Sequence, residues 1–316
     1  LCRARERGGK EAKMSDAAQM VPGRAEVVAP GVRRLLAPNP SPMTGPGTNT
    51  YLLGQTDIAV VDPGPDDPAH LSAILAAINS QTVSHILITH AHRDHSALAP
   101  ALAQATGAPI CAFGHPEAGR SATMQTLAAN GLAGGGEGVH TELTPDLVLK
   151  DGQHIQGADW SATTLHTPGH FAGHLAFVVE ANGEVALTGD TILGWTSTLI
   201  SPPDGDVGAF MTSCERLRSL GAKQFLPGHG PKIDEPAERL DWLMGHRRNR
   251  EAQIVAMLTN GPATVAELTT QIYADVTDYL LPMAERNVLA HLIDLHERNR
   301  VNAAPKLSAT AIFALR

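Results

Sequence analysis

The stretch His90-Ala91-His92-Arg93-Asp94-His95 places three imidazoles and one carboxylate within six consecutive positions. It directly follows residues 83–89, an apolar and β-branched run that is typical of a buried strand. A strand that ends at His90 turns the chain at the edge of a sheet, where one loop can direct ligands at two metal ions. Imidazole nitrogen and carboxylate oxygen are usual zinc donors, and the absence of cysteine favours a catalytic over a structural metal site.

The segments on either side of this hexapeptide alternate between strand and helix patterns. Residues 49–53 and 58–61 form a predicted hairpin that ends at Asp62-Pro63-Gly64, and Asp67 before Pro68 predicts the start of a helix. The remaining expected elements are a helix over 97–105, strands over 109–113, 160–165, 175–179 and 185–188, and an irregular insertion over 114–140.

Two strand-rich halves, each with its own helices, predict an α+β fold: a four-layer αββα sandwich of two sheets covered by helices. The pattern changes at Pro236, which opens a long helical stretch, and Thr264 with Glu267 forms a capping box for another helix. Helices followed by a short hairpin predict a small C-terminal winged-helix domain. The expected domains are a flexible N-terminal extension over 1–21, a catalytic domain over 22–235, and a linker helix with the winged-helix domain over 236–316.

Composition is typical of a soluble globular enzyme. Hydrophobic residues make up 43% of the chain, and the formal charge of −8 lacks the basic footprint of a dedicated nucleic-acid binder. The three cysteines lie far apart, which disfavours a disulfide framework. Because no apolar run is long enough to span a bilayer and no secretory leader is recognisable, we expect a cytoplasmic protein without a membrane partner.

Three later motifs each place a metal-ligand type beside a glycine at an expected strand end. They are Thr167-Pro168-Gly169-His170, Thr188-Gly189-Asp190-Thr191 and Pro227-Gly228-His229-Gly230. Glycine allows the backbone to approach a metal closely. Each motif alone is weak evidence, but together with the hexapeptide they indicate one composite site.

In this order the motifs resemble those of the metallo-β-lactamase superfamily, and the resemblance covers residues 27–234. It implies two metal ions, expected to be Zn²⁺ with iron or manganese as other candidates. Asp62 matches an early aspartate that supports such sites, although it could equally be a turn-forming residue before Pro63. The ligands that the resemblance implies are His90, His92 and His170 for the first metal, Asp94, His95 and His229 for the second, and Asp190 as a bridge.

A finer resemblance links the chain to the beta-lactamase-like protein 2 branch of this superfamily. It rests on residues 194–206 (GWTSTLISPPDGD), 261–264 (GPAT) and 284–288 (AERNV). The branch carries a C-terminal winged-helix domain, and some members act on single-stranded RNA. Phosphodiester cleavage is therefore one of the reactions to be considered.

The expected reaction is hydrolysis of an ester, thioester, lactone or phosphodiester. Two metals about 3.5–4 Å apart can share a hydroxide, the expected nucleophile, and polarise the scissile group. Asp94 is a ligand and a candidate proton acceptor, and we favour the ligand role because a bound carboxylate is a weak base. His174 is a candidate proton donor to the leaving group, with a packed or supporting histidine as the alternative.

Other functions remain open at this point. They are a single-stranded-RNA endoribonuclease, a regulatory nucleic-acid-binding protein with a structural metal site, a β-lactamase, and a redox di-iron protein. The partner is accordingly a small molecule or single-stranded RNA, and a homodimer is also considered. Arg247, Arg248 and Arg250 either contact a phosphate backbone or form a solvated helix face, and the balance of charges beyond residue 237 favours the latter.

Overall fold

The computed structural model describes residues 20–134, 138–179, 185–275 and 277–316. Most of the predicted extension over residues 1–21 lies outside these ranges. Within them, no helix combines the length and apolar character needed to cross a bilayer. The domain limits at residues 22, 235 and 236 stay predictions.

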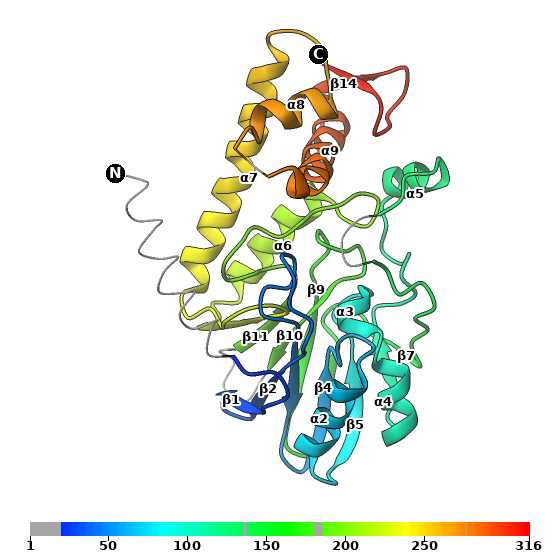
Figure 1. Cartoon of the computed structure of the whole chain (residues 1–316), viewed down its shortest axis with the longest axis vertical. Coiled ribbons are helices and arrows are strands. Elements are labelled where there is room, and N and C mark those ends of the chain that lie inside the picture. Colours follow the sequence, from blue (N-terminus) through cyan, green and yellow to red (C-terminus); the bar gives the residue numbers. More distant parts are fainter. Residues whose placement is uncertain (1–19, 135–137, 180–184, 276) are drawn as a thin grey trace.

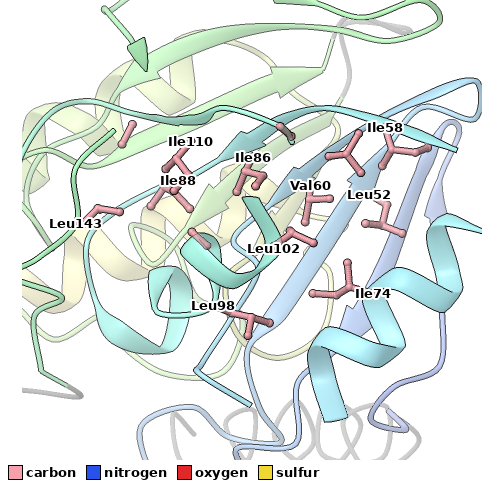
Figure 2. Packing of buried hydrophobic residues seen from close by; sticks show 14 of the residues in the cluster. Leu52, Ile58, Val60, Ile74, Ile86, Ile88, Leu98, Leu102, Ile110 and Leu143 are labelled. Carbon is pink, nitrogen blue, oxygen red and sulfur yellow. The ribbon is translucent and has the colours of Figure 1, made fainter. Parts of the chain in front are cut away.

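A seven-stranded sheet forms the first half of the protein, antiparallel from β1 to β4 and parallel from β4 to β7. Helices α2 (Pro68–Ile78) and α4 (Ala99–Thr106) cover its outer face, where Figure 2 shows Ile74 and Leu102 directed onto the sheet. The strands, in spatial order, are β1 (Glu26–Ala29), β2 (Val32–Leu36), β3 (Asn49–Leu53), β4 (Asp57–Val61), β5 (Thr82–Leu87), β6 (Ile110–Ala112) and β7 (Leu147–Val148).

A five-stranded sheet packs face to face against the first one. Tyr51 and Leu87 of the first sheet meet Phe177 and Leu226 of the second in one buried cluster. The outer face of the second sheet is covered by α6 (Val207–Ser219) and the first half of α7 (Pro236–Leu258). The predicted four-layer αββα sandwich is therefore confirmed. The second sheet runs in the order β12 (Gln224–Pro227), β11 (Val185–Gly189), β10 (Leu175–Val179), β9 (Ser161–His166) and β8 (His154–Gln156).

The C-terminal module is a winged-helix fold that continues from α7, the long helix that runs out of the sandwich in Figure 1. The predicted capping box is present, because the Thr264 hydroxyl accepts from the Glu267 amide and the Glu267 carboxylate accepts from the Thr264 amide. The module comprises β13 (Ala263–Thr264), α8 (Val265–Ile272), the 3-10 turn η1 (Asp278–Leu280), α9 (Leu281–Glu297), β14 (Val301–Ala304) and β15 (Ile312–Leu315).

The expected irregular insertion contains a helix that the sequence pattern did not indicate. Helix α5 (Ala122–Ala129) is capped by the Ser121 hydroxyl, which accepts from the Met124 amide. Met124 and Leu127 are buried in the apolar cluster of the C-terminal module. The helix is short and only weakly amphipathic, so its sequence pattern did not predict it. The residues that bury Met124 and Leu127 lie more than a hundred positions further along the chain. Helix α5 thus ties the catalytic sandwich to the winged helix.

His291 makes the C-terminal module sensitive to acid. Its ring is 1% exposed, and neither ring nitrogen has a hydrogen-bond partner among the described residues. Burial, together with the nearby Arg247, lowers the pKa of His291 from 6.5 to about 3. A neutral His291 therefore contributes stability that is complete above pH 6.5 and is lost as the pH falls from 6.5 toward 3.

We expect His291→Leu to reduce this dependence on pH. Each pH unit below 6.5 costs the wild type about 1.4 kcal/mol through this group, so between pH 7 and pH 5 its free energy of unfolding should fall by about 2 kcal/mol more than that of His291→Leu. Urea denaturation at both pH values measures the difference. His115→Leu, at an exposed histidine, is the matched control. Parallel pH profiles for wild type and His291→Leu would contradict the assignment.

Candidate metal centre

Strand ends from both sheets meet at one edge of the sandwich, and each delivers part of the site. The hexapeptide follows β5, and its second half enters the short helix α3 (Arg93–Ser96). The loop after β9 carries His170, the end of β11 carries Asp190, and the end of β12 carries His229. All seven residues with predicted ligand roles are buried at this edge.

A first group of donors consists of His90, His92 and His170. Nδ1 of His92 lies 2.9 Å from Nε2 of His90 and 3.0 Å from Nε2 of His170. Three imidazole nitrogens that converge in this way match a three-histidine metal site.

A second group consists of Asp94, His95 and His229. Oδ2 of Asp94 lies 3.3 Å from Nε2 of His95 and 3.2 Å from Nε2 of His229. Asp190 lies between the two groups, because its Oδ2 is 3.2 Å from His229 Nε2 and 3.8 Å from His170 Nε2. A third group, His90, His95 and Asp190, overlaps the other two, so the seven residues form one continuous cluster of donors.

In four of these histidines the Nδ1 atom points away from the centre, toward an oxygen atom. These contacts determine the tautomer of each neutral ring, and so which nitrogen can bind a metal. A ring whose Nδ1 donates a hydrogen bond presents an unprotonated Nε2 on its other side. The contacts are His90 Nδ1 to Thr89 Oγ1 at 2.9 Å, His95 Nδ1 to Asp62 Oδ2 at 2.9 Å, His170 Nδ1 to the Leu199 carbonyl at 2.7 Å, and His229 Nδ1 to the Gly47 carbonyl at 3.2 Å.

These residues fit a pair of divalent cations. The Nε2 atoms of His95 and His229 lie 3.2 Å apart and face the same two carboxylates, Asp94 and Asp190, a spacing that suits a shared cation. Oδ1 of Asp190 is buried without a hydrogen-bond partner among the described residues, which is costly for a buried acceptor atom. The donor set of nitrogen and carboxylate oxygen, without sulfur, suits zinc, iron or manganese.

The electrostatics differ between the two halves of the centre. Burial lowers the pKa of His92 to about 3, so the first group is a neutral donor set. Burial also opposes the charged form of His229, but Asp190 and Asp94 outweigh it and raise the pKa of that ring to about 9. Burial would raise the pKa of Asp190, yet His229 and His95 hold it well below the usual range. The second half is therefore the one that attracts positive charge.

Asp62 supports the centre from the end of β4. Its Oδ1 accepts from the Thr89 amide at 2.8 Å, and its Oδ2 accepts from the Thr89 hydroxyl at 2.7 Å and faces His95 Nδ1. The backbone of Asp62 adopts φ 49°, a left-handed conformation that aspartate tolerates better than most residues. The supporting role and the turn-forming role are thus both met by one residue.

Gly228 and Gly189 allow the strand ends to approach the ligands. A Cβ atom at Gly228 would lie 2.3 Å from Asp190 Oδ1, and one at Gly189 would lie 2.6 Å from His174 Nε2. Both distances are too short for any side chain, so glycine is required by close contact at these two positions.

His174 lies behind the centre, and its ring is fully buried. Its Nε2 accepts from the Asp190 amide at 3.2 Å, so the proton of the neutral ring sits on Nδ1, which faces the Thr167 hydroxyl at 2.9 Å. Burial, followed by the nearby His170, keeps the pKa of His174 well below 6.5. Because both nitrogens are engaged and the ring does not line the cavity over the ligands, the geometry favours the supporting role over proton donation.

We expect His174→Ala to weaken metal binding by about 10- to 100-fold, the usual cost of losing a group that orients a ligand. The substitution leaves the buried Asp190 amide without an acceptor and frees the Asp190 side chain to move. Metal content and turnover should fall together, as measured by elemental analysis and initial rates. His154→Ala, at an exposed histidine on β8, is the control. Full metal occupancy with reduced turnover would instead support proton donation.

A cavity of about 260 Å³ opens over the ligands and extends to the C-terminal module. His92, Asp94 and Asp190 line its floor, and His246 of α7 and Met283 of α9 line its far side. No recognisable motif surrounds His246 in the sequence. His246 lines the cavity because α7 packs against the sandwich, and a local sequence pattern does not predict that packing.

Arg247 corrects the interpretation of the basic run on α7. Its side chain is 2% exposed, its Nη2 donates to the Thr198 carbonyl, and its Nη1 donates to Asn287 Oδ1 at 3.0 Å. It is therefore neither a phosphate contact nor part of a solvated face. Arg248, next to it, is exposed as expected.

Comparisons with known proteins agree with this fold. The sequence profile of the metallo-β-lactamase superfamily matches residues 43–229, and that of the β-lactamase-associated winged-helix domain matches residues 264–306. The chain therefore belongs to the metallo-β-lactamase superfamily, as a hydrolase with a C-terminal winged helix.

The particular relatives include members of the branch that the sequence resembled. A beta-lactamase-like protein 2 homologue of Caenorhabditis elegans is 31% identical and aligns over 79% of each chain. The atrochrysone carboxyl ACP thioesterase of Aspergillus fumigatus is 28% identical over 84% of this chain and 81% of its own length. A metallo-β-lactamase family protein from Thermus thermophilus superposes with a TM-score of 0.73, at 28% identity, over 92% of this chain and all of its own.

Proposed function

We propose that this protein is a binuclear metal-dependent hydrolase of acyl compounds and that thioesters are its preferred substrates. The observation that carries the proposal is the overlap of three donor groups, one of which contains Asp190, beside a mostly apolar cavity. Zn²⁺ is the proposed metal, with iron or manganese as alternatives that elemental analysis decides. Bound metals in such a site supply Lewis acidity and a water nucleophile active at neutral pH.

The residues of the chain would hold the reaction centre rigid while the acyl carbon is attacked. Asp62, the Leu199 carbonyl and the Gly47 carbonyl fix the ring planes of His95, His170 and His229. The Thr48 hydroxyl donates to Asp94 Oδ2 at 3.2 Å and orients that carboxylate. We propose Asp94 as a ligand because the same oxygen faces His95 and His229, which leaves it poorly placed to accept a proton.

The leaving group distinguishes thioesters from other acyl substrates. Hydrolysis forms a carbon–oxygen bond and breaks the carbon–sulfur bond, and the sulfur departs as a thiolate. A thiol has a pKa of about 8.5, so its thiolate leaves at neutral pH without a protein acid. His174, the candidate proton donor, is enclosed behind Asp190 and does not line the cavity, which suits a leaving group that needs no protein acid. The thioesterase among the relatives adds support.

The charges around the cavity favour a neutral substrate over RNA. Among the described residues that line it, there is neither a lysine nor an arginine. Binding of an RNA strand relies on several basic contacts to successive phosphates. We therefore rank phosphodiester cleavage below acyl hydrolysis.

A regulatory function through the winged helix is also disfavoured. In helix-turn-helix modules the second helix enters the major groove. Here the corresponding helix, α9, is buried along the unbroken run from Val288 to Ile293, so it is covered on all sides there. A helix in that position is packed as core.

A substrate panel tests the proposal. Purified protein loaded with Zn²⁺, Mn²⁺ or Fe²⁺ is assayed on S-hexanoyl-N-acetylcysteamine, 4-nitrophenyl hexanoate and a single-stranded oligoribonucleotide, with metal content measured in each sample. We expect kcat/KM to be highest for the thioester and to be lost on chelation. Cleavage of RNA at a rate above that of both acyl substrates would contradict the proposal, as would undiminished activity in His92→Ala.

A further inference from the structure

The side of the cavity opposite the metal ligands is built by the C-terminal module. Leu280 of η1 and Met283 of α9 face the cavity together with Leu199, which belongs to the loop after Asp190. Leu199 also places its carbonyl 2.7 Å from His170 Nδ1. The apolar wall therefore begins directly beside a ligand of the centre and continues into the winged helix.

This wall is fastened to the catalytic sandwich at defined points. Asn287 Oδ1 accepts from the Ile200 amide at 3.2 Å and from Arg247 at 3.0 Å, and Arg286 donates to the Pro202 carbonyl at 3.2 Å. Both residues lie within one turn of Met283 on α9. The hydrogen bonds hold the start of α9 in register with the loop that contains Leu199, so the width of the cavity is set by the contact between the two domains.

The volume limits what can enter. A cavity of about 260 Å³ lies at or below the lower end of the usual range for small-ligand sites, roughly 300–1,000 Å³. It is too small for a whole carrier-bound substrate, so one part of the substrate must stay outside. A large polar thiol would find no basic partner among the described lining residues, whereas an aliphatic acyl group matches Leu199, Leu280 and Met283.

We propose that the winged-helix module selects the acyl group: an aliphatic acyl chain lies between Leu199 and the Leu280–Met283 wall, with the thiol part directed outward. This inference rests on the proposed acyl-hydrolase function and adds the identity of the group that the second domain recognises. Leu280 and Met283 are accordingly residues that determine specificity, and they take no part in the chemical step.

The test is a chain-length profile of kcat/KM. Acetyl, butyryl, hexanoyl, octanoyl and decanoyl thioesters of N-acetylcysteamine are compared in wild type, Met283→Trp and Met283→Ala. One methylene that no longer fits costs about 10-fold or more in kcat/KM. We expect Met283→Trp to lower kcat/KM for the longest accepted chain by at least about 10-fold while acetyl changes little, and Met283→Ala to move the optimum toward longer chains.

Controls separate the inference from the function on which it rests. Glu285→Trp adds the same bulk at an exposed position of α9 and should leave the profile unchanged. Thermal unfolding and metal content identify a variant that fails to fold. In that case Leu280→Ala provides an independent way to enlarge the cavity. Equal changes at every chain length would overturn the inference. Absence of thioester hydrolysis in the metal-loaded wild type would overturn the proposed function itself.

Discussion

Asp190→Asn is expected to lower kcat/KM by more than about 100-fold and to release metal, because Asp190 is the residue that contacts both donor groups. Its Oδ1 lies 3.5 Å from His95 Nε2, and its Oδ2 lies 3.2 Å from His229 Nε2 and 3.8 Å from His170 Nε2. Asparagine keeps the shape but removes the charge and replaces one acceptor oxygen by a donor. Loss of an outer partner alone costs 10- to 100-fold, so loss of the bridge should cost more.

The measurement pairs elemental analysis with kcat/KM on the same samples. Asp204→Asn is the matched control: this carboxylate is also buried, but it pairs with Arg120 at 2.7 Å and belongs to none of the donor groups. The control should lose stability and keep its metal. Two bound equivalents of metal and near-normal turnover in Asp190→Asn would show that Asp190 does not bridge.

Arg247→Ala is expected to lower the free energy of unfolding by about 3 kcal/mol. Arg247 stacks over Phe210 at 5.3 Å and joins three elements: α7, α9 through Asn287, and the loop after Asp190 through the Thr198 carbonyl. Burial lowers the pKa of Arg247 to about 10, so the guanidinium is charged at neutral pH. Truncation removes these hydrogen bonds and leaves a cavity, and both effects destabilise.

Activity should decline along with stability in this variant. The Thr198 hydroxyl donates to the Asp190 carbonyl at 2.9 Å. If Thr198 loses its contact with Arg247, the backbone of Asp190, a proposed ligand, becomes more mobile. Arg248→Ala, at the exposed neighbour, should change stability by no more than about 0.5 kcal/mol. Arg247→Met keeps most of the volume without a buried charge, and urea denaturation of the three variants separates packing from hydrogen bonding. Equal stability of Arg247→Ala and Arg248→Ala would contradict the linking role.

The residues that cluster at the candidate metal centre could be picked out because each lies in a short local motif. Each ligand lies beside a glycine or a turn at a strand end, as in residues 167–170 and 227–230, and such short motifs are legible in single windows of sequence. Strand ends in an αββα sandwich gather at one edge, so motifs far apart in the chain could be assigned to one site. The N-cap at Asp67 and the capping box at Thr264 could be predicted for the same reason. A capping side chain forms hydrogen bonds with backbone amides only three or four residues away.

The sequence by itself determined the fold class, several of the central strands and helices, and the candidate ligands, because hydrophobic periodicity, caps and ligand motifs act over a few residues. Only the tertiary structure decided that Arg247 is buried, that α5 packs on the winged helix, and that His246 and Met283 line one cavity with the candidate ligands. These outcomes depend on contacts between segments 40 or more positions apart in the chain, such as Arg247 with the Thr198 carbonyl and Met124 with the C-terminal module. Such packing depends on many contacts between residues far apart in the sequence, so it cannot be predicted from a short stretch of the chain.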